Sequence, residues 1–118
     1  MDKEELKNRT KQFARRCIKL SLALPKLPLG SHIRSQLIRS TTSVAANYGA
    51  ACLAQSRAGF IAKLGIVIEE VDETCFWMEL IIEELLLNKK YILPLFEEAK
   101  ELTSIFISSR KTARANST

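Results

Sequence analysis

Four long segments of the chain repeat apolar side chains every three or four residues, which is the period of an α-helix with one buried face. The predicted helices cover about residues 3–24, 31–53, 57–87 and 94–112. Only four glycines and three prolines interrupt the 118 residues, and two of the prolines, Pro25 and Pro28, lie in the short connection after the first helix. The pattern therefore predicts an all-α protein.

Each predicted helix has its own apolar stripe. The stripe of residues 3–24 is Leu6, Phe13, Cys17, Leu20 and Leu24, and that of residues 31–53 is Ile33, Leu37, Val44 and Tyr48. Pro25 is expected to end the first helix, and Ser31, which follows Gly30, is a suitable N-cap for the second.

The third predicted helix carries the most regular stripe. Its members are Phe60, Leu64, Val67, Val71, Thr74, Met78, Ile81 and Leu85, at alternating steps of four and three. Such a seven-residue repeat is typical of a helix-bundle seam. In the fourth helix Pro94 suits the first position, and the stripe is Leu95, Ala99, Leu102, Phe106 and Ser109. We predict one domain, a four-helix bundle over residues 1–112, followed by a basic flexible tail over 113–118.

The opposite side of the third predicted helix is unusual because apolar residues stand among its acids. Ile66, Phe76, Trp77 and Leu80 lie near the directions of Glu69, Glu73 and Glu84. One explanation is a tryptophan that lies along the surface. The other, which we favour, is a second contact surface that meets an apolar and basic partner, such as the first or second helix of a neighbouring copy.

The second predicted helix contains a long uncharged run, "STTSVAANYGAACLAQS", from Ser40 to Ser56. Two pairs of small residues in it, Ala45 with Gly49 and Ala46 with Ala50, are spaced four apart. Small residues at this spacing permit the close approach of another helix. We expect that helix to come from another copy of the chain.

Charge is divided unevenly along the chain. Residues 1–63 hold twelve Lys and Arg against three acids, whereas residues 64–118 hold six against ten, which together give the net charge of +5. The division favours contact with a polyanion or pairing between unlike surfaces of subunits, although solvated helix faces explain it too.

Nucleic acid is the polyanion that we consider. The cations that would bind its phosphates are Lys7, Lys11, Arg15, Arg16, Lys19 and Arg34. Each neutralised phosphate releases counterions, so such binding would weaken steeply with salt. No aromatic platform stands among these bases, so binding would follow shape and charge more than sequence.

Enzymatic chemistry finds little support in the residues. His32 is the only histidine, and the acids Glu69, Glu70, Asp72 and Glu73 lack the Glu-x-x-His pairs of di-metal bundles. We predict no catalytic residue, no metal site and no cofactor. The odd, widely spaced set Cys17, Cys52 and Cys75 suits reduced thiols in the cytoplasm. No segment reaches the ~20 apolar residues of a membrane helix.

The run "RSTTSVAANYGAACLAQSRAGFIAKLGIVIEEVDETCFWMELIIEELL", with the flanks "LALPK" and "LTSIFISSRKTARAN", resembles the bacterial four-helix-bundle family related to the 23S rRNA intervening-sequence protein. The most specific pieces are "SVAANY", "SRAGFIAKLGIVIEE" and "DETCFWMEL". The resemblance implies a left-handed up-and-down bundle that assembles as a homopentameric ring. It also points to the accessory proteins of diversity-generating retroelements, which are basic pentamers that partner a reverse transcriptase and bind nucleic acid.

Two positions depart from the family pattern, in which arginine is common at the position of Gly49 and glutamate at that of Gly59. Asn47, Tyr48, Glu73 and Trp77 match, which implies structural contacts, with Asn47 satisfying a backbone group or the Glu73 carboxylate across an interface. The predicted oligomer interface is Ala46, Asn47, Gly49, Ala50, Ile66, Glu73, Phe76, Trp77 and Leu80.

We therefore predict a non-enzymatic, cytoplasmic oligomer, expected to be a pentamer, that serves as a scaffold or accessory for RNA, DNA or a reverse-transcriptase-like enzyme and has no membrane partner. The alternative is a purely structural self-association module with a protein partner and no nucleic acid. A third reading, a metal-dependent hydrolase built on the carboxylates of residues 57–87, would require bound metal.

Overall fold

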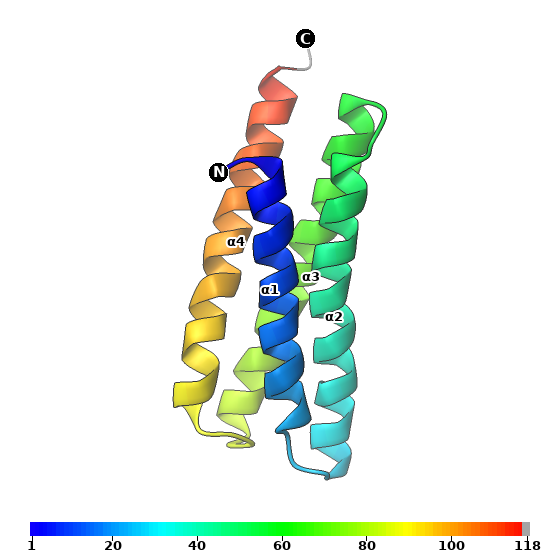
Figure 1. The fold of residues 1–118 in the computed structure, drawn as a ribbon. Helices are drawn as coiled ribbons and strands as arrows, with labels where there is room; N and C mark the ends of the chain where they lie inside the picture. The colour runs from blue at the N-terminus through cyan, green and yellow to red at the C-terminus, as the bar shows by residue number, and fades with distance from the viewer. Residues whose placement is uncertain (117–118) are drawn as a thin grey trace.

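The computed structural model describes residues 1–116 and contains four α-helices: α1 (Lys3–Leu22), α2 (Pro28–Cys52), α3 (Arg57–Glu83) and α4 (Lys89–Ala115). Consecutive helices run in opposite directions and pack side by side, and α4 returns beside α1 (Figure 1). The bundle measures about 50 × 20 × 20 Å. No strand occurs within residues 1–116, so the predicted all-α, single-domain, up-and-down fold is confirmed.

The core follows the predicted stripes because each helix turns its apolar face inward. Every residue of the predicted stripes of α1 and α2 is buried, as are the α3 stripe from Leu64 to Ile81 and the α4 stripe from Leu95 to Phe106. Phe60 and Ser109, at the far ends, are only half-buried. Leu85 is 87% exposed, so its assignment to the core is wrong.

Leu85 leaves the core because α3 ends at Glu83, four residues before the predicted end at residue 87. The backbone of Leu85 has φ 55°, in the left-handed region. The Leu86 N–H then donates to the Ile81 carbonyl and the Leu85 N–H to the Ile82 carbonyl, at 3.0 and 3.1 Å. This is a Schellman termination, which satisfies the last carbonyls of α3 and reverses the chain.

The start of α4 also differs from the prediction. The helix begins at Lys89, where the side chain of Asn88 accepts a hydrogen bond from the Lys90 N–H at 3.0 Å. Pro94 therefore lies inside the helix rather than at its first position. Residues 113–115 belong to α4, so the predicted tail is helical there, and residues 117 and 118 lie outside the described residues.

The connection between α1 and α2 is tighter than predicted. Helix α1 ends at Leu22, two residues early, and α2 begins at Pro28 with Leu27 as its extended N-cap. Pro28 at the first helical position has no N–H that needs a partner. Ser31 therefore lies within α2 and does not cap it.

Polar pairs tie the helices together. Arg9 of α1 binds both oxygens of Glu98 of α4, at 2.7 and 2.8 Å. In the core, the hydroxyls of Ser40 and Thr74 lie 2.9 Å apart and join α2 to α3. Each buried side-chain nitrogen or oxygen in residues 1–116 has a hydrogen-bond partner.

Candidate interaction surfaces

The six candidate cations for nucleic acid lie in three different settings. Lys7 and Lys11 face a hollow of about 440 Å³ between α1 and α2, opposite Ala45, Ala46 and Gly49. Arg15 is exposed one helical turn beyond Lys11. Lys7, Lys11 and Arg15 are spaced four residues apart, so they form one row along α1, which we call the basic row.

The wall of small residues on α2 is open to this hollow. A Cβ added to Gly49 would meet no atom within 4 Å. Ala46 is exposed and Ala45 and Gly49 are half-buried, so these small side chains leave a shallow space beside the two lysines of α1.

Arg34 has a structural role instead. Its Nε and Nη2 atoms donate to the carbonyls of Ser21 and Leu24, at 3.3 and 3.2 Å. Ser21 lies in the last turn of α1 and Leu24 lies just after it, where backbone acceptors lack partners within the helix. Arg34 therefore binds α2 to the last turn of α1.

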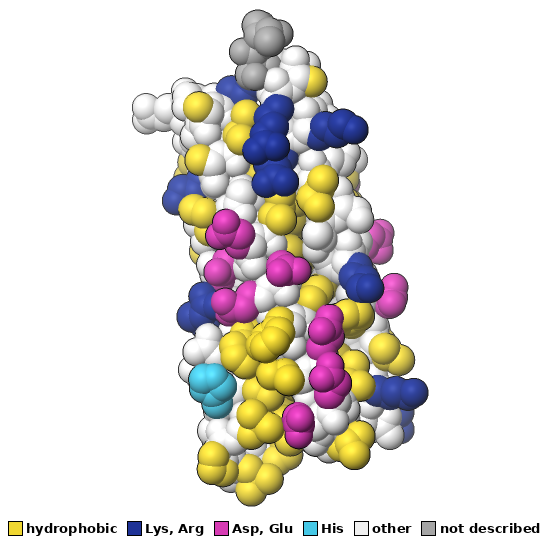
Figure 2. All heavy atoms as spheres, turned by 180° about the vertical axis from the view of Figure 1, so that it is seen from behind, with side chains coloured by type: hydrophobic (Ala, Val, Ile, Leu, Met, Phe, Trp, Pro, Cys, Tyr) yellow, Lys and Arg dark blue, Asp and Glu magenta, His cyan; other side chains and the backbone are white. Residues whose placement is uncertain are grey.

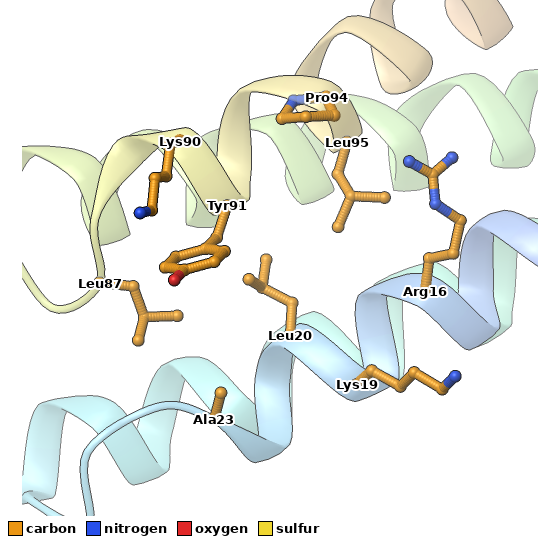
Figure 3. A pocket seen from close by; sticks show the side chains of 9 residues that line it. All are labelled: Arg16, Lys19, Leu20, Ala23, Leu87, Lys90, Tyr91, Pro94 and Leu95. Atoms are coloured by element: carbon orange, nitrogen blue, oxygen red, sulfur yellow. The ribbon is translucent and has the colours of Figure 1, made fainter.

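Arg16 and Lys19 border a groove of about 510 Å³ between the end of α1 and the start of α4. Leu20, Ala23, Leu87, Pro94 and Leu95 supply its apolar surface (Figure 3). Lys90 and Tyr91 stand on the α4 side, and the Lys90 Nζ lies 5.1 Å from the centre of the Tyr91 ring. Within residues 1–116, none of the cations Arg16, Lys19 and Lys90 forms an ion pair.

The sequence did not reveal this groove. Leu20 and Leu95 were assigned to the core, and residues 88–93 were assigned to the connection before a helix at Pro94. A usable signal was the cap residue Asn88, which starts α4 early enough to place Lys90 and Tyr91 on a helix facing α1.

The aromatic pair of α3 is only partly covered by its own chain. The Trp77 ring packs edge-on against His32 of α2 at 5.4 Å between centroids, and its Nε1 donates to Glu73 at 3.2 Å. Trp77 is half-buried, whereas Phe76, 5.0 Å from the indole, remains 51% exposed. Contacts within the chain therefore account for the position of the Trp77 ring, whereas no such contact covers the exposed side of Phe76 in the described residues.

Four carboxylates surround Phe76 on the outer side of α3. Glu69, Asp72, Glu79 and Glu83 are exposed and make no ion pair within residues 1–116. Their steps from Phe76 of seven, four, three and seven residues place them on its side of the helix. Figure 2 shows acidic side chains bordering an apolar patch beside the histidine. We call Phe76, Leu80 and these carboxylates the α3 patch.

Asn47 was expected to satisfy a backbone group or the Glu73 carboxylate across an interface, and both side chains bind groups of their own chain. The Asn47 side chain donates to the Ser43 carbonyl at 3.0 Å and to the Ser43 hydroxyl at 2.9 Å. Glu73 accepts from Arg39 of α2 and from Trp77. Of the predicted interface, Ile66, Phe76 and Ala46 are exposed, and Gly49, Ala50 and Leu80 are half-buried.

The cysteines are free thiols. Burial raises the pKa of the Cys17 thiol well above its ordinary value. Burial, with the charges of Asp72 and Glu79, raises the pKa of Cys75 to about 11. Within residues 1–116, no three His, Cys, Asp or Glu side chains are placed to hold a metal ion. None of the helices in that range is long and apolar enough to cross a bilayer.

The fold places the chain in the class of all-α, up-and-down four-helix bundles. Residues 2–108 match the family of the 23S rRNA-intervening sequence protein, and the chain belongs to this family.

A solved crystal structure of a protein of unknown function, from the S23 ribosomal protein family of Bacteroides thetaiotaomicron VPI-5482, is similar to this chain. The two are 31% identical, with a TM-score of 0.81 over 94% of this chain and 99% of that one. No curated protein matches the sequence.

Proposed function

We propose that this protein is a non-enzymatic, self-associating scaffold that binds the phosphate backbone of RNA or DNA through the basic row of α1. The observation that carries the proposal is the setting of Lys7, Lys11 and Arg15. They follow one side of α1, and a shallow hollow with small-residue walls lies beside Lys7 and Lys11.

The setting suits a polyanion better than a protein carboxylate. Lys11 and Arg15 are exposed and without an ion pair in residues 1–116, while Lys7 meets only the exposed Glu4 at 3.3 Å. An exposed pair of this kind contributes little stability, so Lys7 remains available to a phosphate. The open space above Gly49 would let a backbone approach closely.

Self-association is the second part of the proposal, and the half-exposed Phe76 supports it. A large aromatic side chain on the outside of a bundle contributes most when another surface covers it. Repetition of the basic row around a ring, which we expect to contain five subunits, would increase avidity for a long polyanion. A nucleic-acid enzyme such as a reverse transcriptase would be a suitable further partner.

The test is a charge reversal of the basic row, Lys7→Glu with Lys11→Glu and Arg15→Glu. Anisotropy titrations of a fluorescein-labelled 30-nucleotide RNA and a matching DNA duplex would be run at several salt concentrations. We expect the wild type to bind with a steep salt dependence. The variant should bind at least about tenfold more weakly at low salt, because three phosphate contacts are lost.

The matched control carries the same charge change elsewhere, as Lys26→Glu with Arg110→Glu and Lys111→Glu. It should bind more tightly than the basic-row variant. Equal losses in both variants would mean that net charge alone governs binding. No binding of the wild type to either probe at 50 mM salt would reject the nucleic-acid part and favour a self-association module with a protein partner.

A second prediction uses the open space at Gly49. Gly49→Arg adds a cation beside Lys7 and Lys11, and its Cβ would meet no neighbouring atom within 4 Å. We expect several-fold tighter binding of the same RNA and a salt slope steeper by about 0.7–0.9, the value of one added phosphate contact. Gly49→Gln, of similar length without the charge, is the control. An arginine variant that binds no better than the glutamine variant would place the polyanion elsewhere.

A further inference from the structure

We infer that the groove between α1 and α4 receives the α3 patch of a second copy of this chain. The inference rests on the self-association proposed above and names the two surfaces that would meet. Phe76 of one copy would enter the groove of the next, and carboxylates around Phe76 would pair with the cations at the groove rim.

The groove has the chemistry that an acidic aromatic patch requires. Its surface is mostly aliphatic, with Leu20 and Leu95 on facing helices, and it holds a volume of about 510 Å³. Arg16, Lys19 and Lys90 stand around it without an ion pair in residues 1–116 (Figure 3). A purely apolar partner would leave these cations uncompensated, whereas an acidic one would pair with them.

The α3 patch supplies the complementary arrangement. Phe76 is 51% exposed at its centre, and Leu80 lies one turn further along the helix. Asp72 and Glu79 stand one turn before and one turn after Phe76, and both are exposed. An apolar centre with a charged rim is the usual anatomy of a protein interface. Here the two rims carry opposite charges.

The two surfaces also lie at the same level of the bundle. His32 and Arg34 lie two residues apart on α2, and His32 packs against Trp77 of α3 while Arg34 donates to the Ser21 carbonyl of α1, so the last turns of α1 lie at the level of Trp77. The groove follows these turns of α1 from Arg16 to Ala23, and the α3 patch is centred on Phe76, which is next in sequence to Trp77. Two bundles placed side by side would therefore bring groove and patch together without sliding along their axes.

The contact would be head-to-tail, because it joins two different surfaces. Helices α1 and α3 are not neighbours in the bundle, so each copy would carry a groove on one side and a patch on another. A contact of this kind leaves one surface of each kind free after two copies meet. It therefore continues to a closed ring or an open filament and does not stop at a dimer.

The experiment exchanges the charges of the two surfaces. One variant carries Arg16→Glu and Lys19→Glu, a second carries Asp72→Lys and Glu79→Lys, and a third carries all four substitutions. All four positions are exposed, so the fold should be kept, and far-UV circular dichroism checks this. Molar mass would be measured by light scattering after size exclusion at 50 µM, against the monomer mass of 13.3 kDa.

We expect the wild type to be larger than a monomer, each two-site variant to fall to the monomer mass, and the four-site variant to recover much of the assembly. Mixing the two monomeric variants should also restore a larger species. The glutamates at the groove of the first variant would pair with the lysines on the α3 patch of the second, and the unchanged groove of the second would receive the unchanged patch of the first. A control with Lys63→Glu and Lys111→Glu should assemble as the wild type does.

The outcomes separate this inference from the broader proposal. A wild type that is monomeric at 50 µM overturns both. A wild type that assembles while both two-site variants also assemble overturns only the pairing of groove and patch, and leaves another surface, such as the small-residue wall of α2, to hold the copies together. Two-site variants that are monomeric but are not rescued by the four-site exchange also overturn the pairing.

Discussion

Gly30→Ala is expected to lower the free energy of unfolding by about 3 kcal/mol, the upper part of the range for overpacking a buried position. Gly30 is buried in the first turn of α2, where a Cβ would lie 2.1 Å from the Pro25 carbonyl oxygen. That oxygen belongs to the backbone of the short α1–α2 connection, so the connection itself must move. Urea denaturation followed by circular dichroism at 222 nm would measure the loss.

The same substitution at Gly49 is the matched control. Gly49 is also a helical residue of α2, but a Cβ there meets nothing within 4 Å. Gly49→Ala should therefore raise the free energy of unfolding by up to about 1 kcal/mol, the difference in helix propensity. If Gly30→Ala proved as stable as the wild type, the α1–α2 connection would have to accommodate the added methyl group, and the expected clash with the Pro25 carbonyl would be wrong.

Arg34→Met should lower the free energy of unfolding by about 2 kcal/mol, the usual range for hydrogen bonds that involve a charged group. The methionine keeps an aliphatic stem but cannot donate to the Ser21 and Leu24 carbonyls. Thermal and urea denaturation would both register the change. Because Arg34 binds the end of α1, we expect affinity for the RNA probe to change less than twofold at a temperature where the variant remains folded.

Arg15→Met provides the converse case. Arg15 is exposed on the basic row and makes no ion pair within residues 1–116, so its replacement should alter stability by less than about 0.5 kcal/mol. It should nevertheless weaken RNA binding and reduce the salt slope. If Arg34→Met bound the RNA probe more weakly but kept its stability, Arg34 would belong to the nucleic-acid-binding surface after all.

The bundle was predictable because its information is local. Apolar stripes with a helical period identified all four helices, and the residues from Leu64 to Ile81 that follow the seven-residue repeat form the seam of α3. Helix ends were less predictable, since several residues offered suitable capping chemistry. Ser31 and Pro94 were plausible starts, but Leu27 with Pro28 and Asn88 begin the helices instead.

The surfaces were less accessible to sequence reasoning because they depend on contacts between helices. The cations of α1 were identified as a group, yet the pattern did not separate the row at Lys7 and Lys11 from the groove at Arg16 and Lys19. Arg34 reaches carbonyls ten and thirteen residues earlier, a distance that only the fold closes. For Trp77, the partner His32 lies on another helix, so its cover within the chain could not be seen in the sequence.

The corner between α3 and α4 holds a residue that lowers the stability of the chain. Leu85 is the only non-glycine residue with positive φ in the part of the chain that the structure describes, and its side chain is 87% exposed. An L-residue in that conformation costs roughly 1–2 kcal/mol, and the exposed leucine regains little of this by burial. Glycine would fit the same backbone without this cost, so a single substitution at this corner is expected to stabilise the bundle, as is common in natural proteins, which are rarely at their stability optimum.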